Sequence, residues 1–291
     1  MKIAVGIATA GRPGLLEVVI RQLSSQTRHA DLVIACAPSL DDIGTPNLAG
    51  VDLLIGPHGL TQQRNAILDR ASGFDVVVFF DDDFLPESSY LEVIERVLTM
   101  HPDIVMVTGC VVADGIIGPG LAVDEARRRL AMLQPIEADS KALEMDPVPN
   151  GYGCNMAVRM DAVAAGNCRF DERLPLYGWL EDVDFSGQLA RVGRIVKVRG
   201  ARGIHLGVKR GRQSGIRLGY SQIANPIYLL RKGTCPWPLA LRLMSRNISA
   251  NFARSIRPEP YIDRRGRLVG NCRAFLDCIE GRLIPERILE L

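Results

Sequence analysis

A run of five apolar residues, Val76-Val77-Val78-Phe79-Phe80, ends in three consecutive aspartates, Asp81, Asp82 and Asp83. β-Branched and aromatic residues in so short a run predict a buried strand. In an open α/β sheet, ligands bind beyond the carboxyl ends of the strands, which is where these aspartates would lie. Because side chains alternate along a strand, Asp81 and Asp83 are predicted to face one way and Asp82 the other.

Two interpretations of this acidic cluster are open from the residues alone. Asp81 and Asp83 could supply two hard oxygen ligands suited to Mg²⁺ or Mn²⁺, shared with a diphosphate. Alternatively, the acids form a solvated turn leading into a helix at Pro86, whose N-terminus favours Asp and Glu. The first interpretation predicts a metal site and the second predicts none.

Predicted strands and helices alternate through the first hundred residues. The strands are expected at residues 2–8, 31–37, 51–55, 76–80 and 104–107. The helices are expected at 14–26, from Gly59 with Thr61 as the N-cap, and at 87–100. This alternation predicts an α/β fold with a parallel or mostly parallel sheet, and the first hundred residues resemble a nucleotide-binding half.

Length and composition limit the class of protein. A chain of 291 residues that is 47% hydrophobic can bury one large core, or one core plus an appendage. No run approaches 18 apolar residues, and Met1–Gly6 looks like a first strand rather than a signal peptide. The seven cysteines form no CxxC pair, which suits reduced thiols in a cytosol. We therefore expect a cytoplasmic globular protein.

The two ends of the chain differ in charge. Residues 199–291 hold 18 of the 35 basic and 6 of the 33 acidic residues, a net charge of +12, whereas the preceding 198 residues carry −10. A basic C-terminal segment indicates an anionic partner. Nucleic acid, an anionic membrane surface and the phosphates of a ligand are the partners that this charge alone leaves open.

A second acidic segment, Gly178–Phe185, precedes a predicted helix that begins near Glu181. Acids favour the first turn of a helix through its dipole, but this does not account for Gly178 and Trp179 ahead of them. A strand is expected at 194–198, with His205 just beyond it. A lone histidine is more often structural than a ligand.

Together these segments resemble the inverting family 2 glycosyltransferases of the GT-A fold over roughly residues 2–217. The matching motifs are Thr9–Pro13, Gly59–Ala66, Asp81–Asp83, Asn150–Asn155, Gly178–Phe185 and His205, and their order and spacing are fairly specific. The resemblance implies a Rossmann-like, mostly parallel sheet flanked by helices. It also implies a catalytic domain at 1–222, with halves near 1–110 and 111–222, and a helical extension at 223–291.

The resemblance implies a role for each matching residue. Asp81, Asp83 and His205 would bind a divalent cation, Mn²⁺ or Mg²⁺, and Asp182 would be the catalytic base. The residues expected to line the nucleotide pocket are Thr9, Arg12, Arg64, Asp81, Asp82, Arg210 and Arg212. One departure is that Ala35-Cys36-Ala37-Pro38-Ser39 replaces the Asp-Asp-Gly-Ser of many relatives, which weakens the assignment of the nucleobase.

The implied reaction moves a sugar from a nucleotide sugar, expected to be a UDP-sugar, to a hydroxyl of a glycan or lipid-linked acceptor. The cation would offset the charge of the leaving diphosphate, and a carboxylate would take the hydroxyl proton. A non-catalytic nucleotide-sugar-binding module of the same fold is one alternative. A sugar nucleotidyltransferase is another, although its Gly-rich loop is absent. A haloacid-dehalogenase-type phosphotransferase fits poorly, because Phe84-Leu85-Pro86 follows the acids.

The segment from Cys235 to Arg257 has helical periodicity and two distinct sides. Its apolar side is expected to hold Trp237, Leu241, Met244, Ile248, Phe252 and Ile256, and its other side Arg242, Arg246, Arg254 and Arg257. Such a helix can lie on the inner face of an anionic membrane, dock on the catalytic domain or form a homodimer contact. No nucleic-acid partner is included in this interpretation.

Overall fold

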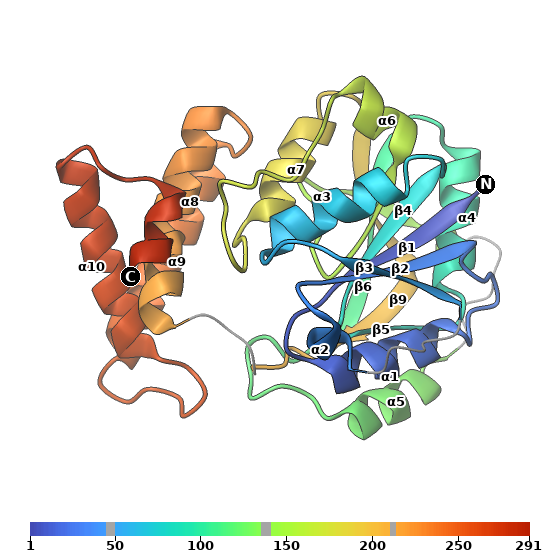
Figure 1. The fold of residues 1–291 in the computed structure, drawn as a ribbon, viewed down its shortest axis with the longest axis horizontal. Helices are drawn as coiled ribbons and strands as arrows, with labels where there is room; N and C mark the ends of the chain where they lie inside the picture. Colours follow the sequence, from blue (N-terminus) through green and yellow to red (C-terminus); the bar gives the residue numbers. More distant parts are fainter. Residues whose placement is uncertain (45–49, 135–140, 210–213) are drawn as a thin grey trace. The chain divides into compact units, whose positions relative to one another are not determined.

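The computed structural model describes residues 1–44, 50–134, 141–209 and 214–291. The strands are β1 (Ile3–Ala8), β2 (Leu32–Ala37), β3 (Val51–Ile55), β4 (Val76–Asp81), β5 (Phe84–Pro86), β6 (Ile104–Asp114), β7 (Met145–Pro147), β8 (Asn155–Arg159) and β9 (Arg194–His205). The helices are α1 (Pro13–Leu23), α2 (Leu40–Ile43), α3 (Leu60–Arg70), α4 (Tyr90–Met100), α5 (Val123–Ala131), α6 (Met160–Ala165), α7 (Glu181–Leu189), α8 (Gly215–Lys232), α9 (Trp237–Arg254) and α10 (Arg264–Ile279). Two 3₁₀ helices, η1 (Lys141–Leu143) and η2 (Pro285–Glu290), complete the described elements (Figure 1).

The described residues form two compact units. The first comprises Met1–His58, Gln62–Arg169 and Gln188–Gly211, and the second comprises Gly59–Thr61, Phe170–Gly187 and Arg212–Leu291. These units divide the chain differently from the predicted domains, because α8 runs without a break across residue 222. The domain limits 1–222 and 223–291 stay a proposal.

A nine-stranded sheet forms the centre of the first unit. Its order is β3-β2-β1-β4-β8-β6-β9-β5, and β7 pairs with β9. β8 runs antiparallel to both of its neighbours, β4 and β6, so β4 and β6 themselves point the same way. β1, β2, β3 and β9 share that direction through their parallel pairings. The predicted α/β architecture with a mostly parallel sheet is confirmed.

Helices cover both faces of this sheet. α1, α4 and α5 share one hydrophobic core with alternate strand residues such as Val5, Val78 and Phe80, all fully or nearly fully buried. α3 packs on the opposite face, where a Cβ on Gly6 would lie 2.5 Å from Ile67 Cγ2. Figure 1 shows α1 and α5 on one side of the sheet and α3 and α6 on the other. Burial on two faces explains why the strands are almost continuously apolar.

The second unit is built from helices. Tyr220, Ile223 and Ala224 of α8 pack with Ala274 of α10 and with Leu283 and Ile288. A second cluster joins Leu174, Leu180 and Val183 to Leu229, Cys235 and Ala240. Across the described residues, none of the helices combines the length and the apolar character needed to cross a bilayer.

Two predicted element boundaries differ from the structure. α3 begins at Leu60, so Thr61 lies in its first turn instead of capping it, and its hydroxyl donates to Leu174 O at 3.2 Å. The last strand does not stop at residue 198 but continues to His205. Glycines weaken the strand pattern there, yet Gly203 is needed because a Cβ would lie 2.2 Å from the ring of Phe84.

Candidate functional site

Asp81 ends β4, and Asp82 and Asp83 form the turn to β5, at the carboxyl edge of the sheet. One ligand atom each from Asp81, Asp83 and His205 can be chosen so that all three atoms lie within 4.8 Å of one another. Asp82 turns away from this group and accepts a hydrogen bond from Thr9 Oγ1 at 2.6 Å. The alternation expected along an extended chain therefore separates the candidate metal ligands from Asp82.

Strand pairing brings His205 to the acids from more than a hundred residues away. β9 pairs with β5, and Phe84, the residue after Asp83, lies opposite His205. β9 also pairs with β6, where Asp114 lies opposite His205. Since β4, β6 and β9 point the same way, Asp81, Asp114 and His205 all end strands at the same edge of the sheet.

Hydrogen bonds fix the orientation of the His205 ring. Its Nδ1 donates to Asp114 Oδ1 at 2.8 Å, and Tyr152 Oη donates to the other oxygen of Asp114 at 2.9 Å. Its Nε2 lies 3.4 Å from Asp83 Oδ1. With Nδ1 held by Asp114, Nε2 is the nitrogen that faces the candidate metal position.

Electrostatics at the site favour charged groups despite burial. Burial lowers the pKa of His205, but hydrogen bonds with Asp114 and Asp83 outweigh this and raise it to about 10. Burial is the largest single influence and raises the pKa of Asp83 and of Asp114, but the hydrogen bond and the charge of His205, together with further hydrogen bonds, lower the pKa of both below its ordinary value. Without a cation, His205 is therefore an imidazolium held between two carboxylates at neutral pH.

Two arginines neutralise the remaining acids. Arg64, 1% exposed, makes an ion pair with Asp81 at 3.0 Å and donates to Gly153 O at 2.7 Å. Arg12 lies 2.7 Å from Asp82 and 3.6 Å from Asp83. Burial nevertheless raises the pKa of Asp82 to about 7 against the effect of Arg12. Thr9, Arg12 and Arg64, predicted to line a nucleotide pocket, thus surround the acidic turn.

The donor set fits a divalent cation. Two carboxylates and one imidazole converge, and all three side chains already hold fixed hydrogen-bonded orientations. Carboxylate oxygens suit Mg²⁺ and Mn²⁺, whereas an imidazole ligand is less suited to Mg²⁺, which prefers oxygen. The chemistry of this set therefore favours Mn²⁺.

Other predicted residues lie in different parts of the chain. Asp182 is in the first turn of α7, in the second unit, and its role as base stays a prediction. Arg210 and Arg212 lie outside the described residues. The neighbouring Lys209 donates through Nζ to Ile116 O at 2.5 Å and Gly115 O at 3.2 Å.

Asp184, two residues after the predicted base, belongs to a buried cluster in the second unit. Its carboxylate is fully buried and accepts from Lys232 Nζ at 2.7 Å and Thr234 Oγ1 at 2.6 Å. Lys232 also donates to Asp171 at 2.6 Å. These bonds tie α7 to the C-terminal end of α8, which gives Asp184 a structural role.

Asp114 and Tyr152 were not predicted as site residues. The strand that contains Asp114 is predicted to end at residue 107, but it continues to Asp114. An apolar run, Val111-Val112-Ala113, therefore ends in an acid at the end of a strand, as the run before Asp81 does. This pattern of an apolar run followed by an acid is visible in the sequence. Only the pairing of β6 with β9 shows that this acid meets His205.

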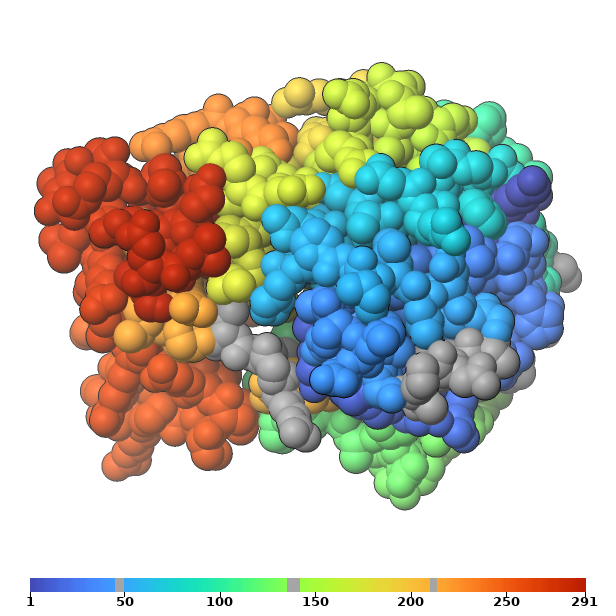
Figure 2. All heavy atoms as spheres, viewed as in Figure 1, coloured from blue at the N-terminus to red at the C-terminus, as the bar shows by residue number. Residues whose placement is uncertain are grey.

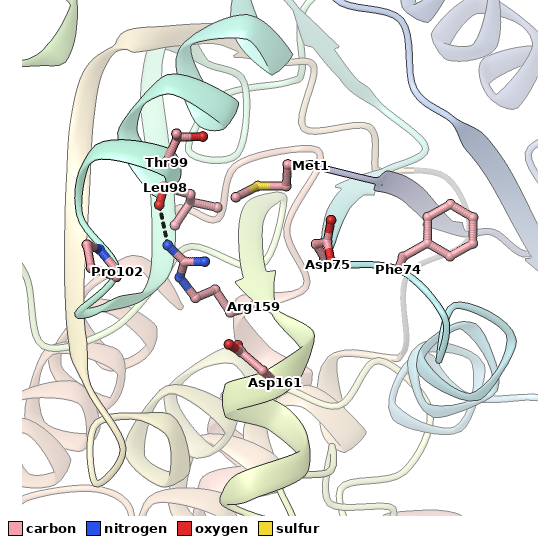
Figure 3. Close-up of a pocket in the computed structure, with 8 residues that line it drawn as sticks. All are labelled: Met1, Phe74, Asp75, Leu98, Thr99, Pro102, Arg159 and Asp161. Carbon is pink, nitrogen blue, oxygen red and sulfur yellow. Dashed lines mark hydrogen bonds between the residues drawn. The ribbon is translucent and has the colours of Figure 1, made fainter.

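A pocket of ≈ 510 Å³ lies at the opposite end of the sheet (Figure 3). It is lined by Met1, Phe74, Asp75, Leu98, Thr99, Pro102, Arg159 and Asp161. Arg159 donates to the carbonyls of Leu98 and His101, so it caps the end of α4. In an open α/β sheet the carboxyl edge carries the ligand, so this pocket is not the candidate site.

Solved structures share this fold. Residues 1–349 of TarS from S. aureus match with a TM-score of 0.58 and 13% identity over 99% of this chain and 82% of that one. A mannosyltransferase from Pyrobaculum calidifontis, solved with GDP-Man and Mn²⁺, matches with a TM-score of 0.54 and 15% identity over 99% and 85%. GalNAc-T7, solved with UDP, GalNAc and Mn²⁺, matches with a TM-score of 0.58 and 16% identity over 96% and 56%.

The chain has a GT-A glycosyltransferase fold. No protein-family model matches the sequence, and no curated protein matches it significantly. At these identities the likeness establishes the GT-A fold and leaves the reaction to the chemistry of the site. The candidate metal group occupies the carboxyl edge of the GT-A sheet, where ligands of α/β folds bind.

Proposed function

We propose that the chain is a metal-dependent, inverting glycosyltransferase of the family 2 type. It would move a sugar from a nucleotide sugar to a hydroxyl of a glycan or lipid-linked acceptor. The observation that carries the proposal is the convergence of Asp81, Asp83 and His205 at the carboxyl edge of a GT-A sheet. A UDP-sugar is the proposed donor, because TarS was solved with UDP-GlcNAc and GalNAc-T7 with UDP.

Charge compensation defines the donor side of the proposed reaction. When bound, the divalent cation would offset negative charge on the departing nucleoside diphosphate. Asp81, Asp83 and the Nε2 of His205 would hold it, and that nitrogen must first give up its proton. Arg12, 24% exposed and already beside the acids, would add positive charge at the diphosphate.

The acceptor side needs a base. As the acceptor oxygen attacks the anomeric carbon, its proton must pass to a positioned carboxylate. We assign this role to Asp182, because the segment Gly178–Phe185 resembles that of inverting enzymes and because Asp184 is engaged by Lys232. A single displacement would convert an α-linked donor into a β-linked product.

Incubation with a panel of UDP- and GDP-sugars and Mn²⁺ tests this proposal through release of nucleoside diphosphate. Release is expected from one donor class and should stop with chelator and with Asp83→Asn. Asp124→Asn, which changes an exposed carboxylate on α5, is the matched control. Binding of a nucleotide sugar without turnover would support a non-catalytic module instead, and exchange of pyrophosphate would support a nucleotidyltransferase.

The proposed base has a separate test. Asp182→Asn keeps the size of the side chain and removes its basicity, so transfer should fall on the order of 10²- to 10⁴-fold while donor binding persists. Glu172→Gln, an exposed carboxylate in the same unit, is the control. Near-normal transfer by Asp182→Asn would remove Asp182 from the reaction. The anomeric configuration of the product, read by NMR, tests inversion independently.

The acceptor class follows from the basic, partly apolar C-terminal segment. A lipid-linked acceptor in the assembly of a surface polysaccharide would bring the chain to a membrane. In α9, Met244 and Ile248 pack inside the helical unit, whereas Trp237, Leu241 and Phe252 are exposed. Part of the predicted apolar side of α9 is therefore buried in the unit and part is exposed. The membrane or dimer contact predicted for this helix stays a proposal.

A further inference from the structure

Helix α10 has its polar and apolar sides reversed relative to a typical surface helix of a globular domain. Its buried side carries small or polar residues, namely Arg264, Gly270, Asn271, Ala274 and Asp277. Its large exposed apolar residues are Val269, Phe275, Leu276 and Ile279, which are 46%, 45%, 58% and 83% exposed, and Arg265, Cys272 and Arg273 are exposed beside them. At 100° per residue Val269, Leu276 and Ile279 fall opposite the buried set, and Phe275 lies at its border. We call the exposed set the outer face of α10.

The buried side accounts for how α10 is held in its unit. Gly219 of α8 and Gly270 of α10 meet closely, because a Cβ on Gly270 would lie 2.1 Å from Ile216 O. Asn271 donates to Gly219 O at 2.7 Å, and Tyr220 donates to Asp277 at 2.8 Å. Close approach through small residues with hydrogen bonds between helices is how helices pack where apolar side chains face lipid.

The outer face contributes nothing to these contacts. Its four large apolar side chains lie within eleven residues of one helix. Scattered exposed apolar residues are ordinary, but a contiguous group of this kind marks an interaction surface. The surface of the C-terminal helices is coloured orange to red in Figure 2.

The described residues from 214 onward carry more basic than acidic side chains, and Arg273 is on α10 itself. Every carboxylate of the described C-terminal helices from residue 214 onward already has a partner: Glu259 with Arg264, Asp263 with Gly266 N, Asp277 with Arg287, Glu280 with Arg282, Glu286 with Arg173 and Glu290 with Arg287. Arg242, Arg246, Arg257 and Arg273 form no ion pair with the described residues. The charge left for a partner is therefore mainly cationic, because Asp263 is the one carboxylate of this set that has no ion pair.

We propose that the outer face of α10 docks on an anionic lipid surface, with the helix lying in the plane of the interface. Apolar side chains would enter the acyl boundary and the arginines would meet lipid phosphates. The sixteen residues of α10 are about 24 Å long, shorter than the hydrocarbon core of about 30 Å, so the helix lies in the interface and does not span it.

A second copy of the chain fits this surface less well than lipid. In a symmetric dimer through the outer face, Arg273 of each copy would need a carboxylate of the other copy, and among the carboxylates of the described C-terminal helices only Asp263 has no ion pair. An anionic bilayer supplies that counter-charge. This docking does not depend on the proposed sugar transfer.

Co-sedimentation of the full chain with vesicles tests the docking. Binding is expected to vesicles that contain phosphatidylglycerol, at about 50 mM salt, and to weaken at about 0.5 M salt and with phosphatidylcholine alone. Ile279→Glu and, at the other end of the face, Val269→Glu should each reduce partitioning by about tenfold or more. Arg273→Glu should reduce it by about fivefold or more.

Ile117→Glu is the matched control, because Ile117 is 70% exposed in the first unit. It should bind vesicles as the wild type does, and circular dichroism should show every variant folded. Absence of binding at low salt, or wild-type binding by both glutamate variants, would overturn the proposal. A dimer in light scattering that dissociates with Ile279→Glu would assign the face to a second copy instead. Release of nucleoside diphosphate without vesicles should be unchanged in all these variants.

Discussion

Replacing Asp114 by Asn tests whether this acid orients His205 for a metal ion. The carboxylate accepts from Nδ1 at 2.8 Å and is itself fixed by Tyr152. An amide can instead donate to Nδ1, which places the proton on Nε2, the nitrogen that faces Asp83. Loss of such a partner typically weakens metal binding about 10- to 100-fold, or about 1.4–2.7 kcal/mol.

Isothermal titration with Mn²⁺ measures this change directly, and Asp124→Asn again serves as the control. With only four histidines in the chain, ¹⁵N-labelled histidine spectra can report the tautomer of His205 in each variant. Tyr152→Phe, which removes one hydrogen bond to Asp114, should have a smaller effect in the same direction. If Asp114→Asn binds Mn²⁺ as tightly as the wild type and keeps the tautomer, the orienting role is refuted.

Four further predictions follow from contacts in the two units. The pKa of His205 is raised to about 10, so Mn²⁺ binding at neutral pH should release one proton and tighten as pH rises, which calorimetry in two buffers measures. Without metal the same raised pKa stabilises the fold fully below pH 6.5, and this contribution should be lost as pH rises from 6.5 through about 10. Lys232→Met should lower the free energy of unfolding by roughly 2–4 kcal/mol, because it leaves the buried Asp184 without its cation, and adding Asp184→Asn should recover part of the loss. Gly270→Ala should cost about 1–3 kcal/mol in denaturant titrations, since its methyl would meet the backbone of α8.

Local patterns predicted the elements that carry strong periodicity. The apolar run before Asp81, the alternation of strands with α1, α3 and α4, and the start of α7 at Glu181 all follow from the spacing of buried residues. These elements bury one or two faces, so their apolar positions match the faces that the structure buries, although the helix ends differ by a few residues.

The less predictable elements depend on long-range pairing. β9 contains Gly200 and Gly203, which locally weaken a strand, yet its pairing with β5 and β6 extends it to His205. α10 has a weak helical pattern because its buried side is small and polar while its exposed side is apolar. No local pattern distinguishes such a helix from an ordinary one, since the side that faces the unit is decided by contacts with α8.

The burial of three adjacent aspartates is explained by the positively charged side chains that pair with them. Three adjacent carboxylates repel one another, and a buried charge without a counter-charge is costly. Here Arg64 pairs with Asp81, Arg12 pairs with Asp82, and protonated His205 pairs with Asp83, so each carboxylate has a counter-charge without a bound cation. A divalent ion at this position would replace the His205 proton between Nε2 and Asp83. Cation binding and proton release are therefore expected to be one event.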